Sequence, residues 1–463
     1  MTETFITESP LDGRKYLERP LATSADIESA LQAATLSQPG WYAAGLTQRV
    51  ALLTRAIEWM VGQTQQLAEE ITWQMGRPIA HSPGEIRGLA ERASYMLGVA
   101  PEALADLQPA GKPGFALRIR RVPVGVVVVI APWNYPYLTA VNALIPALVA
   151  GNSVILKHSH QTPLCAERFV EAFREAGVPA GVVQYLHASH EDTAHLIADR
   201  RVASVCFTGS VAGGHAVVRA ISSGFATAGL ELGGKDPAYV CEDANLQQAV
   251  ETLADGAFFN AGQSCCGIKR IYVAASRYRD FVDGLVAQTE LYRLGSPLDP
   301  DTTLGPVVRA AAAAAIRDQV SDAVSQGARQ VIDQSRFPAS RLGTAYLAPQ
   351  VLLGVDHSMR VMREESFGPV VAVMSVSSDE EALRMMNDSD FGLTAAIFSA
   401  DTGRAQRLAD ALDTGTVFLN RCDYLDPALA WTGVKNSGRG CTLSKLGFEQ
   451  LTRPKSFHFR SLT

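Results

Sequence analysis

The stretch Val124-Gly125-Val126-Val127-Val128-Val129-Ile130-Ala131-Pro132-Trp133-Asn134-Tyr135-Pro136 decides the fold class of this chain. It is an apolar run of strand length that ends in a turn carrying the side-chain amide of Asn134. Short apolar runs alternate with helical patterns after it. This alternation predicts a parallel, doubly wound α/β sheet, whose ligands bind beyond the carboxyl ends of the strands.

Four further strands are predicted for this sheet. In addition to residues 124–131, these strands are Ser153–Lys157, Val182–His187, Ser204–Phe207 and Ala226–Leu230. Between them, Pro163 begins a helix that Gly177 ends, and Ser189 with Asp192 forms a capping-box pattern for the next helix. Residues 26–62 and 64–76 are predicted to be helical, because their apolar residues recur at every third or fourth position.

A second Rossmann-like pattern follows Glu231. Strands are predicted at Asp236–Val240, Arg270–Val273, Val370–Val376 and Gly415–Asn420, and helices at Gln247–Phe259, Ser276–Tyr292, Val307–Gln326, Glu380–Asn387 and Thr402–Leu412. The segment Lys455–Arg460 alternates as an edge strand does. A chain of 463 residues exceeds what one hydrophobic core supports, so at least two lobes are expected.

Composition excludes several classes of protein. The hydrophobic fraction of 47% and the net charge of -6 are those of an ordinary globular protein. Lys and Arg form no basic stripe, so no nucleic-acid partner is expected, and no apolar segment reaches the ~20 residues that span a membrane. The N-terminal segment Met1–Pro10 has no secretory or transit character, and the seven cysteines lack metal-ligand spacing. We therefore expect reduced thiols, no metal and a cytoplasmic location.

Two motifs carry residue types suited to acyl chemistry. The segment Asn260-Ala261-Gly262-Gln263-Ser264-Cys265-Cys266 follows the segment Glu231-Leu232-Gly233-Gly234-Lys235. A thiolate attacks a carbonyl carbon, and hydrolysis of the thioester needs a water activated by a base. Cys265 and Glu231 can supply these two steps. Taken alone, each also has an ordinary structural reading, as a small buried side chain and as a strand-end carboxylate.

Five motifs together resemble those of the NAD(P)-dependent aldehyde dehydrogenase superfamily in sequence and in order. They are the stretch 124–136, Phe207-Thr208-Gly209-Ser210, the two segments at Glu231 and Cys265, and Glu364-Glu365-Ser366-Phe367-Gly368-Pro369. The resemblance runs from about Val122 to Lys455. It implies two Rossmann-like doubly wound lobes with a small β oligomerisation flap, an aldehyde dehydrogenase-like α/β fold. Residues 1–100 and 123–232 then form the dinucleotide-binding domain, 233–440 the catalytic domain, and 101–122 and 441–463 the oligomerisation segments.

The resemblance also implies roles for single residues. Cys265 is the implied nucleophile, Asn134 stabilises the oxyanion, and Glu231 is the general base. The implied cofactor-binding residues are Ala131, Pro132, Trp133, Lys157, Ser159, His160, Gly209, Ser210, Gly213, Leu232, Gly233, Glu365 and Phe367. The usual Gly-x-Gly-x-x-Gly fingerprint is absent. In its place, exposed backbone amides at the start of the helix after Ser210 can hold a pyrophosphate.

One departure from the family pattern concerns the choice of cofactor. Family members often read Lys-Pro-Ser-Glu where this chain reads Lys157-His158-Ser159-His160. An acidic residue at the last position accepts hydrogen bonds from the ribose hydroxyls and repels a 2'-phosphate. His160 removes that repulsion, so NADP is an open alternative to the expected NAD.

The substrate is less well specified. By resemblance, the aldehyde pocket is lined by Tyr135, Thr139, Asn142, Ser264, Asp423, Tyr424 and Trp431. Asp423 with the aromatic residues suits a cationic amino-aldehyde, although it can also be a loop residue making an Asx turn. Arg421 equally suits a carboxylated substrate such as succinate semialdehyde. Both substrate classes stay open at this point.

Three functions are consistent with the sequence. The first is oxidation of a small-molecule aldehyde to the carboxylic acid with NAD(P)⁺, through a thiohemiacetal and a thioester on Cys265. The second passes the thioester to coenzyme A, and Glu231 argues against it. The third is a non-catalytic protein with this fold, which the joint presence of Cys265, Asn134 and Glu231 disfavours. An unpaired terminal edge strand predicts self-association, as a homodimer or homotetramer.

Overall fold

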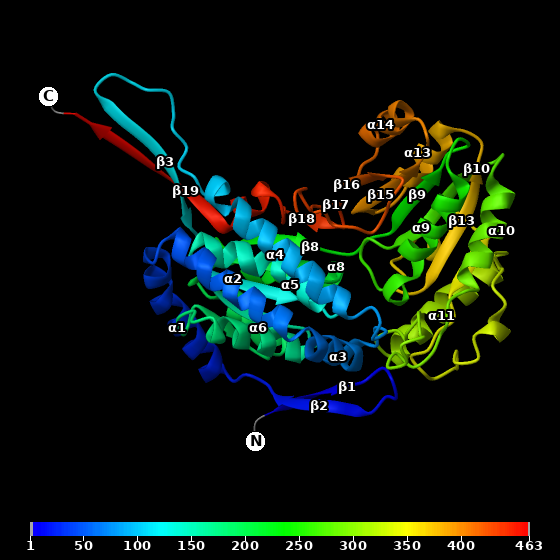
Figure 1. Ribbon diagram of the computed structural model, residues 1–463, viewed down its shortest axis with the longest axis horizontal. Helices are drawn as coiled ribbons and strands as arrows, with labels where there is room; N and C mark the ends of the chain where they lie inside the picture. Colours follow the sequence, from blue (N-terminus) through cyan, green and yellow to red (C-terminus); the bar gives the residue numbers. More distant parts are fainter. Residues whose placement is uncertain (1–2, 462–463) are drawn as a thin grey trace.

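Two large sheets form two lobes in the computed structural model of the chain (Figure 1). The model describes residues 3–461, so the outermost two residues of each predicted terminal segment lie outside it. The predicted α/β fold with two Rossmann-like lobes is confirmed. No helix in the described range has both the length and the apolar character needed to cross a membrane.

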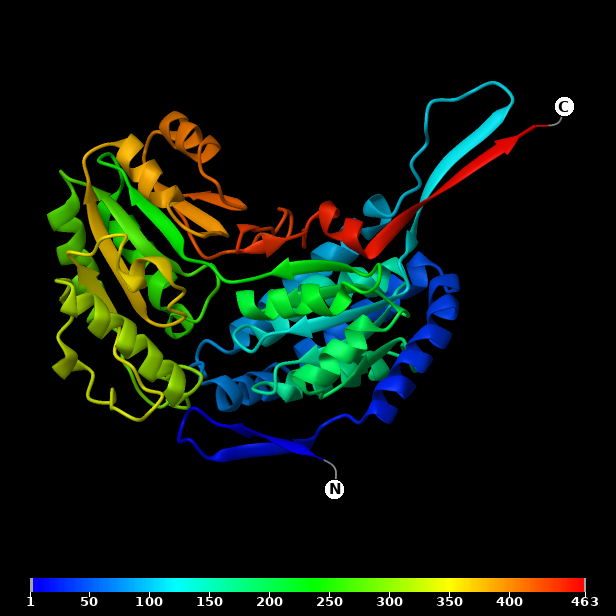
Figure 2. The same ribbon diagram turned by 180° about the vertical axis from the view of Figure 1, so that it is seen from behind.

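The first lobe contains a six-stranded sheet in the order β18-β8-β7-β4-β5-β6. Its parallel strands are β4 (Val126–Ala131), β5 (Ser153–His158), β6 (Val183–Tyr185), β7 (Val202–Thr208) and β8 (Thr227–Glu231), and β18 (Gly438–Arg439) pairs antiparallel with β8. One face is covered by α2 (Leu46–Gly62), α3 (Thr64–Met75), α4 (Pro83–Ala103), α5 (Pro136–Ala150) and α6 (Pro163–Glu175). The other face, seen in Figure 2, is covered by α1 (Ser24–Ala43), α7 (His190–Ala198) and α8 (Val211–Ile221).

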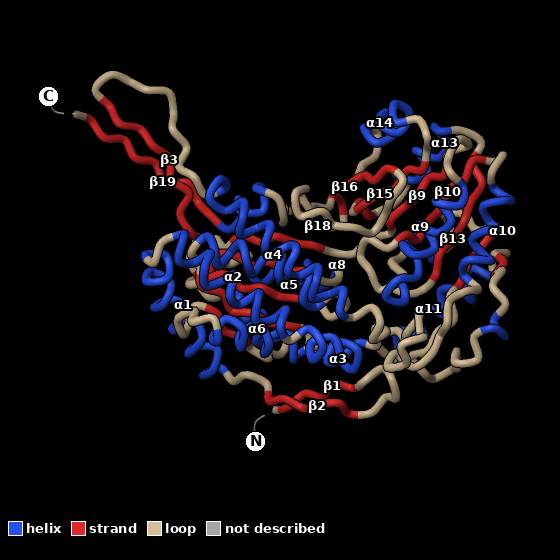
Figure 3. Tube along the Cα trace, viewed as in Figure 1, coloured by secondary structure: helices blue, strands red, loops and turns tan. Residues whose placement is uncertain are grey.

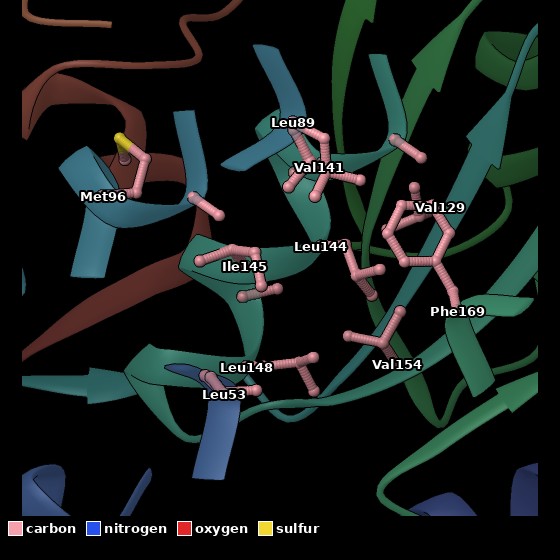
Figure 4. Close-up of a cluster of buried hydrophobic side chains, with 14 of the residues drawn as sticks. Leu53, Leu89, Met96, Val129, Val141, Leu144, Ile145, Leu148, Val154 and Phe169 are labelled. Carbon is pink, nitrogen blue, oxygen red and sulfur yellow. The ribbon is translucent and has the colours of Figure 1, made fainter. Parts of the chain in front are cut away.

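The sequence of β4 explains why helices cover both faces of this sheet. Val127 and Val129 belong to the cluster formed with α2 to α6, whereas Val126 and Val128 belong to the cluster formed with α1, α7 and α8. A strand covered on both sides is apolar at every position, unlike one with a solvated face. Figure 4 shows Val129 among side chains of the first cluster. Full burial of each such side chain contributes roughly 1.5–3 kcal/mol to folding.

The second lobe contains a seven-stranded sheet in the order β11-β12-β13-β10-β9-β15-β16. The strands are β9 (Asp236–Val240), β10 (Ile268–Ala274), β11 (Arg329–Gln330), β12 (Gln350–Leu353), β13 (Val370–Val376), β15 (Thr394–Phe398) and β16 (Thr416–Leu419), and only β11 pairs antiparallel. Helices α9 (Leu246–Phe258) and α10 (Tyr278–Thr289) cover one face. Helices α11 (Ala310–Ser325), α12 (Arg360–Arg363), α13 (Asp379–Asn387) and α14 (Thr402–Asp410) cover the other.

Two antiparallel ribbons lie outside these sheets (Figure 3). Strand β3 (Phe115–Pro123) pairs along its whole length with β19 (Thr452–Arg460), and this ribbon projects from the first lobe. Strands β1 (Thr4–Glu8) and β2 (Lys15–Pro20) form a hairpin near the N-terminus. The remaining elements are short: β14 (Phe391–Gly392), β17 (Val434–Lys435) and the 3₁₀ helices η1 (Phe259–Gly262), η2 (Gln334–Arg336) and η3 (Lys445–Leu451).

Most predicted elements are present with ends shifted by a few residues. Residues 236–240 and 370–376 form strands with the predicted bounds. The hairpin β1–β2, strand β15 and helix α4 were not predicted. Helix α4 begins with Pro83 in its first turn, contains Gly88 and Gly98, and includes Pro101 near its end. Packing of its apolar face against α5 and α2 outweighs these weak helix formers.

Candidate active site

The segments predicted to carry the chemistry meet between the two sheets. Strands β8, β7, β4 and β5 are parallel neighbours, so the segments after them share one edge of the first sheet. Strands β9, β10 and β13 are parallel neighbours in the second sheet, so the segments before them also lie side by side. Because only Leu232–Lys235 joins β8 to β9, the carboxyl edge of one sheet adjoins the amino edge of the other.

Glycines allow three of these segments to touch. A Cβ on Gly234 would overlap the carbonyl oxygen of Cys265, so the motif after Glu231 contacts the cysteine loop directly. A Cβ on Gly233 would overlap the carboxylate of Glu365, and one on Gly262 would overlap the carbonyl of Gly368. The motifs at Glu231, Cys265 and Glu365 therefore pack as one unit, and any larger residue at these glycines would separate them.

The thiol of Cys265 lies in a turn between η1 and β10 and is partly exposed. Asn260 and Ala261 precede this turn and have positive φ angles of 53° and 54°. This left-handed conformation is strained for residues other than glycine. Lys269 donates to the carbonyl oxygens of Gly262 and Gly368, at 2.8 and 2.9 Å. The loop is thus held from the side of the second sheet.

Asn134 holds the same loop from the side of the first sheet. Its side-chain amide donates to the carbonyl of Gln263 at 3.1 Å, and its own carbonyl accepts from Arg77 Nη2 at 2.6 Å and from Asn260 Nδ2 at 3.1 Å. Arg77 is a residue that the sequence reasoning missed. It forms a fully buried ion pair with Glu85, whose carboxylate also accepts from the first backbone amides of α5.

The side chain of Glu231 lies at the end of β8. It accepts hydrogen bonds from Thr442 Oγ1 at 2.5 Å and from Thr208 Oγ1 at 3.0 Å. Burial raises the pKa of this carboxyl, and the two hydroxyl donors and the charge of Arg92 oppose that shift. A carboxyl with a raised pKa is a stronger base once ionised, which suits proton abstraction near neutral pH.

A cavity of about 640 Å³ lies beside these groups. It is lined by Cys265, Glu231 and all of the predicted substrate residues: Tyr135, Thr139, Asn142, Ser264, Asp423, Tyr424 and Trp431. Asp423 accepts from Ser264 Oγ at 3.0 Å and Cys266 Sγ at 2.9 Å, and Arg421 stacks on the ring of Tyr424. Gly84, Arg87, Gly88, Glu91 and Arg92 of α4 form a further wall, which was missed because α4 itself was not predicted.

The glycines of the predicted phosphate-binding loop lie against the ring of Phe207. A Cβ on Gly209 or Gly213 would overlap the ring of Phe207, so both positions need glycine. The hydroxyl of Ser210 accepts from the amide of Gly213 at 3.1 Å and caps α8. A glycine turn ahead of a capped helix start suits a pyrophosphate group, so these residues fit a dinucleotide.

The segment after β5 has two histidines in different settings. His158 is buried, and its ring contacts the carbonyl of Pro136 at 3.0 Å, while burial lowers its pKa to about 4. His160 stacks on Phe5 of β1 and contacts the carbonyl of Ala188 at 2.9 Å. Burial, followed by the charge of Lys157, lowers the pKa of His160 to about 4, so the ring is neutral near pH 7.

The other predicted cofactor residues lie around the same edges. Ala131 ends β4 and is followed by Pro132 and Trp133. Ser159 follows β5, and Leu232 and Gly233 follow β8. Phe367 has a positive φ of 47° and meets Trp133 edge to face, with ring centroids 5.5 Å apart. Glu365 accepts from the amide of Gly234 at 3.1 Å. Burial lowers the pKa of Lys157 to about 8.

Comparisons with known proteins agree with this geometry. The model of the family described as "Aldehyde dehydrogenase family" matches residues 1–457. The chain belongs to the aldehyde dehydrogenase family. A succinate-semialdehyde dehydrogenase [NADP(+)] of Deinococcus radiodurans is 35% identical to this aldehyde dehydrogenase, over 97% of this chain and 94% of the relative. A vanillin dehydrogenase of Pseudomonas fluorescens is 36% identical, over 97% of this chain and 93% of the relative.

A solved structure agrees with the fold of this family member. The crystal structure of an indole-3-acetaldehyde dehydrogenase complexed with NAD⁺ superposes with a TM-score of 0.94 and is 32% identical, covering 99% of this chain and 93% of the other. The family assignment makes this chain an NAD(P)-dependent aldehyde dehydrogenase. The relatives named here act on three different aldehydes.

Proposed function

We propose that this enzyme oxidises an aldehyde to the carboxylic acid, with Cys265 as nucleophile and Glu231 as general base. The observation that carries the proposal is the single cavity lined by both side chains, with the amide of Asn134 bonded to the loop that carries the cysteine. The Cys265 thiolate adds to the carbonyl carbon and forms a thiohemiacetal. When bound, the dinucleotide supplies a hydride acceptor, and loss of hydride turns the thiohemiacetal into a thioester.

The oxyanion of the thiohemiacetal needs hydrogen-bond donors. The Asn134 amide has two N–H groups, and only one of them has an acceptor within the described residues. The second N–H and the backbone amide of Cys265 are the proposed donors. Each such donor is typically worth roughly 3 kcal/mol of transition-state stabilisation. Arg77 and Asn260 act as positioning residues, because both bond to the carbonyl of Asn134.

Glu231 is proposed to activate the water that hydrolyses the thioester. In the structure each oxygen of its carboxylate accepts from one threonine hydroxyl, which leaves a further lone pair on each oxygen for a water. Because its pKa is raised by burial, the base becomes protonated as the pH falls into a range above that of an ordinary glutamate. The rate of deacylation is therefore expected to decline on the acid side.

Substitution of Cys265 by serine tests the nucleophile. A serine hydroxyl is far less ionised than a thiol, so dehydrogenase turnover should fall at least about a thousandfold. Dinucleotide binding, measured by quenching of protein fluorescence, should remain. Cys241→Ser is a matched control, because Cys241 is a free thiol buried in the core of the second lobe and does not line the cavity that contains Cys265. Near-normal turnover by Cys265→Ser would exclude the assignment.

Substitution of Glu231 by glutamine tests the base. Rapid mixing should give one burst of reduced cofactor per active site, followed by steady-state turnover about a hundredfold or more slower. In this variant the steady-state rate should no longer decline on the acid side, because the carboxyl that becomes protonated is absent. Steady-state turnover equal to that of the wild type would remove Glu231 from the mechanism. Formation of an acyl-CoA product on addition of coenzyme A would instead identify the alternative thioester acceptor.

Both nicotinamide cofactors are proposed to bind, with NAD preferred. His160 stands where a carboxylate would repel a 2'-phosphate, so this chain lacks that repulsion. The imidazole is neutral near pH 7, however, and so gives the phosphate no positive partner. The relative from D. radiodurans is named for NADP(+), and the indole-3-acetaldehyde dehydrogenase structure contains NAD⁺. We further propose that the β3–β19 ribbon joins subunits of a cytoplasmic homodimer or homotetramer, because within residues 3–461 no strand pairs with the outer edge of β19.

A further inference from the structure

We propose that Arg92 and Asn142 form an anion-binding subsite in the cavity wall, and that the substrate is an aldehyde carrying a carboxylate. This inference rests on the proposed function and adds the class of aldehyde. Neither residue belongs to the loops that carry Cys265, Glu231 or Asn134. Arg92 comes from α4 and Asn142 from α5, and both line the cavity that contains Cys265.

Arg92 is a buried cation with unused donors. Its side chain is 9% exposed. Its Nη1 donates to the carbonyl of Leu138 at 2.9 Å and to Asn142 Oδ1 at 3.2 Å. Within residues 3–461 its Nε and Nη2 groups have no hydrogen-bond acceptor, and no carboxylate lies within ion-pair distance. A buried guanidinium of this kind is costly unless an anion pairs with it.

Asn142 adds a second unused donor at the same place. The side-chain oxygen of Asn142 accepts from Arg92, so the Nδ2 group of Asn142 points away from the guanidinium. This nitrogen is fully buried and has no partner among the described residues. With the side-chain oxygen of Asn142 bonded to Arg92, the side-chain groups without a partner on these two cavity-lining residues are N–H groups. A carboxylate, with two oxygens and no donor, complements such a set.

The acidic residues of the cavity are engaged or lie at its mouth. Asp423 accepts from Ser264 and Cys266, and burial raises its pKa, which weakens its attraction for a cation. Glu91 accepts from the hydroxyl of Tyr424 at 2.8 Å at the exposed rim. Asp255 is exposed at the same opening. The buried carboxylates of Glu231 and Asp423 each accept two hydrogen bonds, whereas Arg92 has no anionic partner within ion-pair distance in the described residues. This difference favours a carboxylated aldehyde over a cationic one.

The test compares three aldehydes of similar length: succinate semialdehyde, its uncharged amide 4-oxobutanamide, and 4-aminobutanal. The wild type should prefer the carboxylated compound in kcat/KM. Arg92→Gln should lower the ratio of kcat/KM for succinate semialdehyde to that for the amide by about tenfold to a hundredfold, chiefly through KM. A purely structural role would lower both values together and leave the ratio unchanged, which would overturn the proposal.

A second variant keeps Arg92 in place. Asn142→Asp supplies an internal carboxylate to the guanidinium, so the fold keeps a satisfied ion pair while the substrate loses its partner. The same ratio should fall at least as far as in Arg92→Gln. Arg200→Gln removes an equal charge from the exposed surface of the same lobe, outside the cavity, and its ratio should change less than about threefold. An equal fall in Arg200→Gln would show that general attraction, and not this subsite, selects the anion.

Binding without turnover separates failure of the inference from failure of the proposed function. Cys265→Ala protein is titrated calorimetrically with succinate, which should bind, and the double variant Cys265→Ala/Arg92→Gln should bind about tenfold or more weakly. Equal binding by the two proteins would overturn the subsite. If 4-aminobutanal is the preferred aldehyde and Asp255→Asn removes that preference, a cationic substrate replaces the proposed one. Absence of turnover with every aldehyde would refute the proposed function, while succinate binding would still report on the subsite.

Discussion

The first lobe buries Arg92 and Lys157, and the second lobe buries Arg270 and Lys269, yet the partners of the two pairs differ. Arg270 donates to the carbonyls of four residues and to the hydroxyl of Tyr272, at 2.9 to 3.2 Å. Lys269 bonds to two carbonyls. Arg92 uses one nitrogen, and the ammonium of Lys157 has no hydrogen-bond partner within residues 3–461.

This difference separates two uses of a buried charge. Carbonyl oxygens accept from most donors of Arg270 and Lys269, so these two side chains hold segments of backbone together. Arg92 and Lys157, by contrast, lie near the segments that carry the proposed substrate and cofactor residues, and they retain unused donors. The number of unused N–H donors on a buried cation therefore indicates a binding site better than its burial alone does.

The largest effect that would test this comparison is on stability. Arg270→Met removes a guanidinium that satisfies several buried carbonyls, so the free energy of unfolding should fall by at least about 3 kcal/mol. Arg92→Met should cost about 1 kcal/mol or less, because few bonds are lost. Urea unfolding followed by circular dichroism measures both values. Equal losses in the two variants would mean that the donors of Arg92 are as fully used as those of Arg270.

A smaller effect concerns the pH dependence of cofactor binding. Burial lowers the pKa of Lys157 to about 8, so the ammonium is charged below that pH and becomes neutral above it. Dinucleotide affinity should therefore weaken as the pH rises through 8, by up to about tenfold between pH 7 and 9.5. Lys157→Met should bind weakly at every pH in a fluorescence titration. If the variant keeps the wild-type pH dependence, another group is responsible.

The smallest expected effect is on the choice of cofactor. His160→Glu introduces a carboxylate near the proposed ribose site and should lower the ratio of kcat/KM for NADP to that for NAD by about tenfold. His160→Gln, which adds no charge, is the control. Because the pKa of His160 is about 4, the wild-type ratio should stay constant between pH 6 and 8. A rise of this ratio on acidification would indicate a charged imidazole.

The sequence predicted the parts of the fold that depend on local patterns. Strands such as Asp236–Val240 and Val370–Val376 are apolar runs next to recognisable motifs, and their bounds agree with the structure. Helix α4 was missed because its glycines and prolines read locally as turns, and contacts with α5 and α2, which are distant in the chain, stabilise it. The hairpin β1–β2 was missed because its strands are short and largely polar.

The candidate site was predictable to the extent that motifs mark it. All predicted substrate residues line one cavity with Cys265. Arg77 and Arg92 belong to no motif, and their importance depends on partners far away in the chain, such as Asn134 and Asn142. A single sequence does not reveal such partners. The stacking of His160 on Phe5 was likewise hidden, because it joins the N-terminal hairpin to the segment after β5.

The wall formed by α4 has an evolutionary consequence. Its cavity-facing residues recur at helical spacing, from Gly84 through Gly88 to Arg92, on an element that contributes none of the proposed reacting groups. Mutations along this one stripe can alter which aldehyde is accepted while the nucleophile, base and hydride-transfer geometry are inherited unchanged. Divergence of substrate range would then be gradual, because each replacement on the stripe adjusts recognition without passing through an inactive ancestor.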